Sequence, residues 1–312
     1  MIKKLFFAAF AALAFVGCNE DRVEPFIDQT GEKVQLTVTI PSNETKVTGY
    51  PSDTQINSIQ VFVFDKNGIY ETSDKGYGSA LSLTCTTGEK KIVALINAPA
   101  ETSVANIDEL RARIVDLNEC EAGSIVMSGE VTKTLSVSSI VAMQVQRLAA
   151  KVAVSDVNLD FALDAHKNLP FRIKAIYLIN VAGTRAYMAD NVPTTWYNKG
   201  GYIQETSLDF LYDEVASGQV ANEDSYTTEH YFYCYPNTTA TKTRLVVEAE
   251  IGGNTYYYPV TLDQVSPNTA YTYSLTITRL GSDSPDSPVV DGMVNFSVTV
   301  KDWVEQDLSE TI

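Results

Sequence analysis

The chain has 312 residues, of which 39 are acidic and 23 are basic, so its formal net charge is −16 at pH 7. That length is enough for two domains, each with a core of its own. The strong acidity argues against nucleic acid, or an anionic membrane surface, as a binding partner.

The N-terminus has the pattern of a bacterial lipoprotein signal. Two lysines precede an unbroken apolar run over residues 5–16, which is shorter than the roughly 20 residues that span a bilayer. The run ends at Cys18, directly after a glycine, as at sites where the thiol is lipidated and a signal peptide, here residues 1–17, is removed. We therefore expect an acylated Cys18 that anchors a surface-exposed protein in the lipid of the outer membrane. The alternative is an ordinary secreted protein with a chance cysteine.

A polar tether over residues 18–33 leads into the first predicted strand. Residues 34–40 alternate apolar and polar side chains, which is the pattern of a half-buried strand. We expect an edge strand that is held only by non-covalent pairing. Its apolar face consists of Val34, Leu36, Val38 and Ile40.

The rest of the first half is strand-rich. Residues 56–70 predict two strands joined by an Asp-Lys-Asn-Gly turn, and residues 89–99 predict a strand that ends at a proline. Residues 104–117 are the best helical segment, because four apolar residues fall on one helical face. Strands return in residues 132–159, and we place a domain boundary within them, which gives a first domain over residues 34–147. The apolar helical face consists of Ile107, Leu110, Ile114 and Leu117.

The second predicted domain, residues 148–312, repeats the strand pattern. Residues 281–288 have the composition of a flexible linker. A last alternating strand follows within about residues 290–312. Many short strands and little helix predict an all-β fold of two tandem β-sandwiches. Before the linker, strands are predicted at residues 171–181, 229–237, 243–251, 255–262 and 270–280.

The sequence contains no recognisable catalytic or metal-binding motif. His166 and His230 have no motif around them, and we expect both at the surface. The acidic cluster of Asp209, Asp213 and Glu214 lacks the spacing of a calcium loop. Apart from Cys18 there are three cysteines, which cannot all pair, so no disulfide framework is implied. We therefore expect no cofactor, no metal and no enzymatic activity.

Two rows of alternating tyrosines suggest glycan binding as a second possible function. Tyr231, Tyr233 and Tyr235 alternate along one predicted strand, and Tyr256 and Tyr258 along another. Exposed tyrosine rows can stack on sugar rings, which would fit a monomeric surface lipoprotein that binds glycans. More often such rows pack inside a sandwich or pair across strands.

The first and last predicted strands suggest a different mechanism. The loop after residues 34–40 holds a trypsin-type site, Lys46-Val47, and a cut there would separate the first strand from the body. Loss of a sandwich strand opens a groove whose edges favour a replacement strand. The patterns alone are equally consistent with two ordinary strands and a surface lysine. A replacement could come from the last strand, which carries Val294, Phe296, Val298 and Val300, before the alternation slips at Trp303.

Several segments resemble the fimbrillin family of Bacteroidales, which are the lipoprotein pilins of type V pili. The resemblance follows the same order over nearly the whole mature chain. It comprises the lipobox ending at Cys18 and residues 34–50, 59–68, 95–99, 147–154, 233–237 and 296–303.

The resemblance implies two transthyretin-like β-sandwich domains with minor helix. It also implies lipidation at Cys18, removal of the N-terminal strand by a trypsin-like surface protease, and polymerisation with homologous pilin subunits by strand exchange into fimbriae. Lys46-Val47 would be the cleavage point, although the best-known members are cut after arginine. Stalk, tip and anchor subunits share this fold, and the short tail after Trp303 is more typical of a polymerising subunit.

Overall fold

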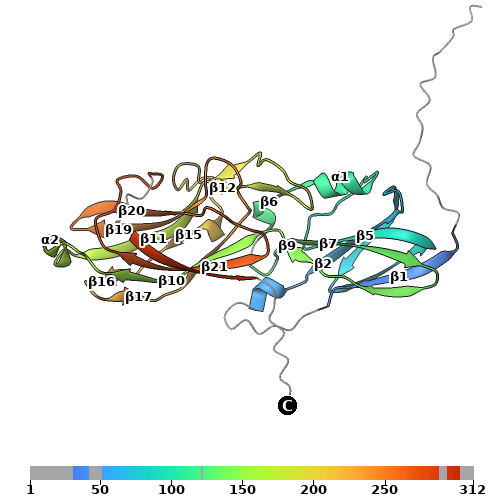
Figure 1. The fold of residues 1–312 in the computed structure, drawn as a ribbon, viewed down its shortest axis with the longest axis horizontal. Coiled ribbons are helices and arrows are strands. Elements are labelled where there is room, and N and C mark those ends of the chain that lie inside the picture. Colours follow the sequence, from blue (N-terminus) through green and yellow to red (C-terminus); the bar gives the residue numbers. More distant parts are fainter. Residues whose placement is uncertain (1–30, 42–50, 121, 288–293, 303–312) are drawn as a thin grey trace, which may run out of the picture.

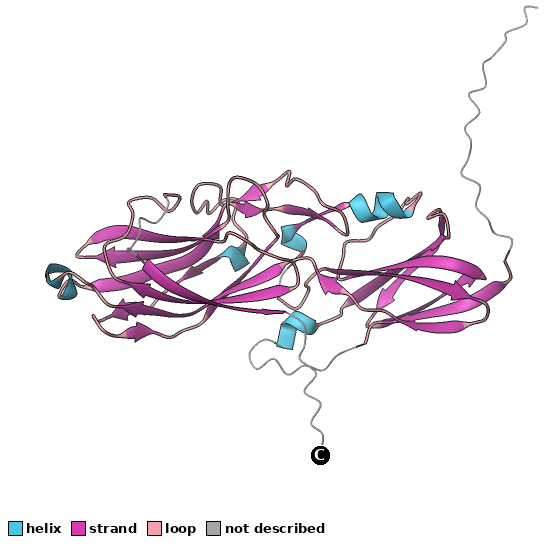
Figure 2. Ribbon diagram, viewed as in Figure 1, coloured by secondary structure: helices cyan, strands magenta, loops and turns pink. Residues whose placement is uncertain are grey.

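The computed structural model describes residues 31–41, 51–120, 122–287 and 294–302 (Figure 1). The predicted lipidation site at Cys18, the predicted cleavage point at Lys46-Val47 and Trp303 lie outside these residues. Within them, strands dominate and helices are short (Figure 2), which confirms the predicted all-β class.

The first β-sandwich packs a five-stranded sheet against a three-stranded sheet. Their inward apolar side chains form one core, which includes Leu36, Val61 and Ile92. In the smaller sheet, β1 (Lys33–Thr39) is antiparallel to β4 (Ala80–Thr86) and parallel to β8 (Ser139–Ala142). The five-stranded sheet has the order β3 (Tyr70–Tyr77), β2 (Ser58–Asp65), β5 (Gly88–Ile96), β7 (Met127–Leu135) and β9 (Gln146–Arg147). The three-stranded sheet has the order β4 (Ala80–Thr86), β1 (Lys33–Thr39) and β8 (Ser139–Ala142).

The second β-sandwich is formed by two five-stranded sheets. The first contains β17 (Ser225–Tyr226), β10 (Ala150–Leu159), β21 (Thr269–Ile277) and β22 (Val294–Asp302) in that order, with β18 (His230–Cys234) also paired to β10. The second contains β15 (Tyr212–Glu214), β11 (Phe171–Ile179), β19 (Arg244–Ile251) and β20 (Asn254–Thr261), with β16 (Gln219–Val220) also paired to β11. The tight hairpin from β19 to β20 turns at Gly252 and Gly253, which both have positive φ values.

The two sandwiches lie end to end, with α2 (Asp164–Lys167) at one end of the molecule and β1 in the sandwich at the other (Figure 1). Two small pairs lie beside the junction: β12 (Val181–Ala182) with β14 (Trp196–Tyr197), and β6 (Ile114–Asp116) with β13 (Thr184–Ala186). Three 3₁₀ turns complete the described elements: η1 (Pro51–Thr54), η2 (Leu117–Glu119) and η3 (Asp209–Leu211).

The helix predicted over residues 104–117 is largely wrong. The helix α1 spans only Ile107–Ala112, because Arg113 adopts an extended conformation (φ −63°, ψ 136°) and the next residues form β6. The pairing of β6 with β13, about 70 residues further along the chain, replaces helical hydrogen bonds that the local pattern favours. Ile114 is consequently 45% exposed.

Candidate functional site

The strand β1 is the central strand of its sheet, and not the edge strand that we expected from the sequence. It pairs with β4 over seven positions, from Lys33↔Thr86 to Thr39↔Ala80. On its other side it pairs with β8 from Leu36↔Ser139 to Thr39↔Ala142. Removing β1 would therefore separate β4 from β8 and leave two unpaired edges facing one slot.

The inward face of β1 lies in the core of the first sandwich. Leu36 and Val38 are fully buried, Ile40 is 5% exposed, and Val34 packs partly against the same core. Burial of an aliphatic side chain contributes about 1.5–3 kcal/mol, so the three buried residues contribute roughly 5–9 kcal/mol. An empty slot would thus expose a strongly apolar surface.

The outward face of β1 forms a short ladder of polar side chains with β4. The hydroxyl groups of Thr37 and Ser82 lie 2.8 Å apart, within hydrogen-bond distance. The Thr84 hydroxyl donates to the Gln35 Oε1 atom at 3.0 Å. These partners lie on the solvent side of the sheet, so they influence register more than stability.

A cysteine lines the slot. Cys85 lies opposite Val34 in the β1–β4 pairing, is 3% exposed and belongs to the core of the first sandwich. Burial, with a smaller effect of the nearby Glu71 carboxylate, raises the pKa of the Cys85 thiol to about 11. Because the thiolate is the reactive form, Cys85 is unreactive while β1 is in place.

The last described strand, β22, lies at the edge of its sheet. It pairs with β21 in antiparallel register over nine positions, from Val294↔Ile277 to Asp302↔Thr269. Its pairing within the described residues is therefore one-sided, unlike that of β1. Val294 is 8% exposed.

The segment before β22 is docked over residues 281–287, whereas its composition predicted a flexible linker. Ser282 and Tyr257 exchange two backbone hydrogen bonds of 2.9 Å each. The Asp286 carboxylate accepts from Arg244 at 2.5 Å and from the Asn180 side-chain amide at 2.8 Å. The chain that leads to β22 thus starts from a fixed point beside β19.

A buried polar cluster lies between the sandwiches, at the start of the chain that follows residues 42–50. The Asp53 carboxylate accepts from the Lys151 Nζ atom at 2.8 Å and from the Tyr233 hydroxyl. The Arg147 Nε atom donates to the Asp53 carbonyl oxygen at 3.1 Å. Asp53 and Lys151 are 4% and 6% exposed. This cluster holds η1 against β10 and β18.

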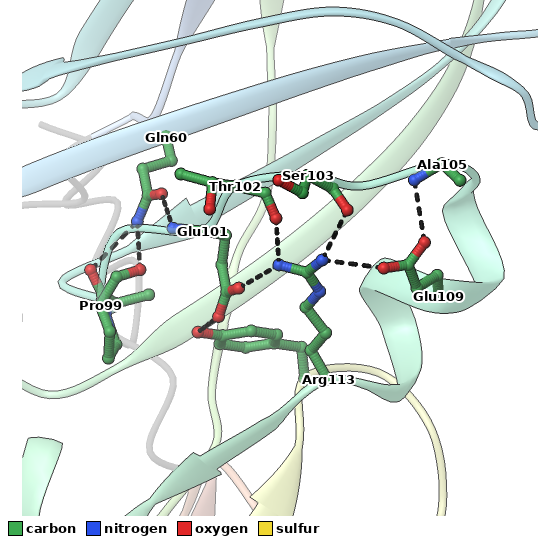
Figure 3. Close-up of polar contacts among 10 residues, drawn as sticks. Gln60, Pro99, Glu101, Thr102, Ser103, Ala105, Glu109 and Arg113 are labelled. Carbon is green, nitrogen blue, oxygen red and sulfur yellow. Dashed lines mark hydrogen bonds and ion pairs between the residues drawn. The ribbon is translucent and has the colours of Figure 1, made fainter.

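A second polar network shapes the loop between β5 and α1 (Figure 3). The Arg113 guanidinium donates to the Glu101 and Glu109 carboxylates and to two loop carbonyls, and the Gln60 side chain bonds the loop backbone on the other side. Glu101 in turn accepts from the hydroxyl of Tyr187, the residue that follows β13, at 2.8 Å. The junction is therefore tied by ordered polar contacts as well as by apolar packing.

The tyrosine rows predicted from the sequence do not form an exposed platform. Tyr233 and Tyr235 are fully buried and Tyr258 is 1% exposed, while Tyr231 and Tyr256 are partly buried and pack on the main core. The structural interpretation of these rows therefore holds, and the glycan-binding alternative loses the surface that suggested it.

His166 and His230 lie in different elements, and His230 contacts the acidic cluster through Asp213. His230 is 8% exposed, so the expected surface position was wrong. Its ring nitrogens form hydrogen bonds of 2.8 Å each with the Asp213 carboxylate and the Tyr226 hydroxyl. His166 lies in α2, and the pocket beside it is lined mainly by Ala162, Leu163, Arg279 and Leu280. Among the residues that the structure describes, no group of three or more metal-ligating side chains comes together, and no helix has the length and hydrophobicity to cross a bilayer.

A comparison with known protein families finds a match in the part of the chain that contains β1. Residues 34–159 match the family model described as major fimbrial subunit protein (FimA), and this segment contains β1 from its second residue onward and both of its neighbouring strands. This part of the chain is similar to the fimbrial subunits that the family model describes. A comparison with curated proteins gives no match.

Solved structures share the fold over most of the chain. A cell adhesion protein from Bacteroides eggerthii superposes with a TM-score of 0.72 at 21% identity, covering 88% of this chain and 97% of the other. A fimbrilin from Porphyromonas gingivalis W83 gives a TM-score of 0.68 at 16% identity, covering 87% and 98%. A cell adhesion protein from Parabacteroides distasonis gives 0.67 at 18% identity, covering 88% and 100%. At these identities the likeness concerns the fold alone.

Proposed function

We propose that the chain is a fimbrial subunit that polymerises by strand exchange. In this proposal it is exported as a lipoprotein acylated at Cys18 and is then cut by a trypsin-like surface protease at Lys46-Val47. The segment that contains β1 leaves, and β22 of another subunit occupies the slot. We take residues 34–147 and 148–312 as the two domains, the second supplying the strand from about residues 290–312.

The observation that carries the proposal is the position of β1. It is the central strand of its sheet and contributes Leu36, Val38 and Ile40 to the core, yet the predicted cut lies only six residues after Ile40. A subunit that lost this strand would expose unpaired edges and apolar surface, which another strand of alternating pattern could cover. A strand given to the next subunit makes a head-to-tail contact, which builds a filament when it does not close into a ring.

The test is limited trypsin digestion of the purified chain, followed by native gel electrophoresis and mass spectrometry of the mature N-terminus. We expect a ladder of polymers whose subunits begin at Val47. The variant Lys46→Ala should stay monomeric under the same digestion. Lys33→Ala is the matched control, because a cut after Lys33 would leave β1 attached, and this variant should polymerise as the parent does. A ladder of equal strength from Lys46→Ala would overturn cleavage at this site.

A further inference from the structure

The sequence of β22 repeats that of β1 position by position when 260 is added to each residue number. The shared pattern covers both faces of the strand and not only the apolar one. On the inward positions of β1 and their counterparts, the pairs are Val34 and Val294, Leu36 and Phe296, Val38 and Val298, and Ile40 and Val300. On the outward positions, the pairs are Gln35 and Asn295, Thr37 and Ser297, and Thr39 and Thr299.

The outward pairs match the polar ladder that β4 forms with β1. Gln35 accepts a hydrogen bond from the Thr84 hydroxyl through a side-chain amide oxygen, and Asn295 carries the same group. Thr37 shares a hydrogen bond with Ser82 through a hydroxyl, and Ser297 also carries a hydroxyl. A strand that enters with this offset would therefore restore both contacts.

We propose that β22 of a second copy of this chain enters the slot between β4 and β8 in the direction of β1, with residue n+260 at the place of residue n, and that Asn295 and Ser297 set this register through Thr84 and Ser82. This inference rests on the proposed strand exchange and specifies its geometry. The entering strand is then antiparallel to β4 and parallel to β8, as β1 is.

The reversed direction fits the ladder less well. If Ser297 stays opposite Ser82 and the strand is turned around, Asn295 falls opposite Ala80, the partner of Thr39. Alanine offers no side-chain hydrogen bond, so the amide of Asn295 loses its partner. In the forward direction, the Asn295 amide lies opposite the Thr84 hydroxyl, and the Ser297 hydroxyl lies opposite the Ser82 hydroxyl.

Shifted registers are also less compatible with the slot. A shift by one residue turns the apolar face of the strand to solvent. A shift to n+262 places Asp302 at the position of Ile40, which is 5% exposed in the core. A shift to n+258 places Met293 on the outward face at the position of Gln35 and Gly292 at the position of Val34. Only the offset of 260 fills every apolar position and every ladder position with a matching side chain.

Disulfide trapping in the assembled polymer tests the register. Ala80, Ser82 and Thr84 on β4 and Asn295 on β22 are exposed, so cysteines at these positions should not prevent folding. Three double variants are compared after trypsin processing and mild oxidation: Asn295→Cys with Thr84→Cys, Asn295→Cys with Ala80→Cys, and Ser297→Cys with Ser82→Cys. Because β4 and β22 belong to different sandwiches of one chain and do not pair there, a ladder on a non-reducing denaturing gel reports links between subunits.

We expect strong ladders from the 295/84 and 297/82 pairs and at least tenfold less linked material from the 295/80 pair. A stronger ladder from 295/80 than from 295/84 would overturn the direction while leaving strand exchange intact. If the variant with Ser297→Cys and Ser82→Cys forms polymers on a native gel but gives no disulfide-linked ladder, the proposed register is wrong for both strand directions. A parent chain that forms no polymer after the cut would overturn the proposed function, and the register with it.

A peptide provides a second measurement that does not depend on the folding of the variants. The synthetic segment of residues 294–302, with a photoreactive group in place of Asn295, is added to the processed parent subunit. Peptide mapping after illumination should locate the label at Thr84. A label centred on Ala80 would contradict the forward direction, and protection of both sites by an excess of the unlabelled peptide is the control for specific binding.

Discussion

Asp53 is a buried carboxylate that joins segments far apart in the chain. Its partners Lys151 and Tyr233 lie 98 and 180 positions away, so no local pattern in the sequence indicates the contact. Burial lowers the pKa of the Lys151 ammonium group, and the Asp53 carboxylate opposes that shift. The Asp53 carboxylate therefore offsets part of the effect that burial has on the Lys151 pKa.

Replacing Asp53 by alanine should destabilise the protein strongly. The change leaves the Lys151 ammonium group buried without its carboxylate, which costs about 3–5 kcal/mol in comparable sites. The free energy of unfolding, measured by urea denaturation, reports the loss. The control is Asp164→Ala, which removes an exposed ion pair with Lys167 and should leave the midpoint unchanged. Equal midpoints for the two variants would contradict the assigned role of Asp53.

At the scale of elements, substitutions in β1 and in β22 should have opposite effects on the stability of the precursor and on that of the polymer. Leu36→Ala should destabilise the unprocessed subunit by about 2–5 kcal/mol, because it leaves a cavity in the core. The same change should leave the polymer as stable as the parent polymer, because the proposed exchange removes β1 from the subunit. Phe296→Ala should instead weaken the polymer. Thermal dissociation of purified fimbriae distinguishes the two, and a polymer weakened by Leu36→Ala would show that β1 is retained.

Much of the strand content could be predicted from the sequence. Alternation identified residues 34–40 and 243–251, because side chains on a half-buried strand alternate between core and solvent. The helix over 104–117 was overextended, since the pairing of β6 with β13 is tertiary and overrides a helical pattern. The central position of β1 could not be predicted either, because sheet order depends on the distant strand β8.

At the scale of the whole molecule, one apolar cluster runs through both sandwiches. It includes Phe64 and Leu95 from the first sandwich and Val152 and Tyr235 from the second. The strand β2 is buried along nearly its whole length, because one face belongs to the core of the first sandwich and the other face to this shared cluster. The two sandwiches should therefore behave as one stiff unit.

Differential scanning calorimetry tests this coupling. We expect a single cooperative transition for the unprocessed chain, because neither sandwich can unfold without exposing the shared cluster. Leu110→Ala, which opens a cavity in the fully buried part of that cluster, should lower the transition temperature of the whole molecule and not of one half. Two separate transitions in the parent chain would contradict a shared core.

The reactivity of Cys85 tests the exchange itself most directly. A thiol reagent at pH 8 is applied to the precursor, to the cut subunit after separation of the N-terminal segment, and to the polymer, with labelling located by mass spectrometry. Cys120 and Cys234 serve as internal controls, because both are fully buried away from the slot. We expect Cys85 to be protected in the precursor, labelled in the cut subunit, and protected again in the polymer or after addition of the peptide of residues 294–302. Labelling of Cys85 in the polymer at the rate of the cut subunit would contradict the refilling of the slot by a strand from a second copy.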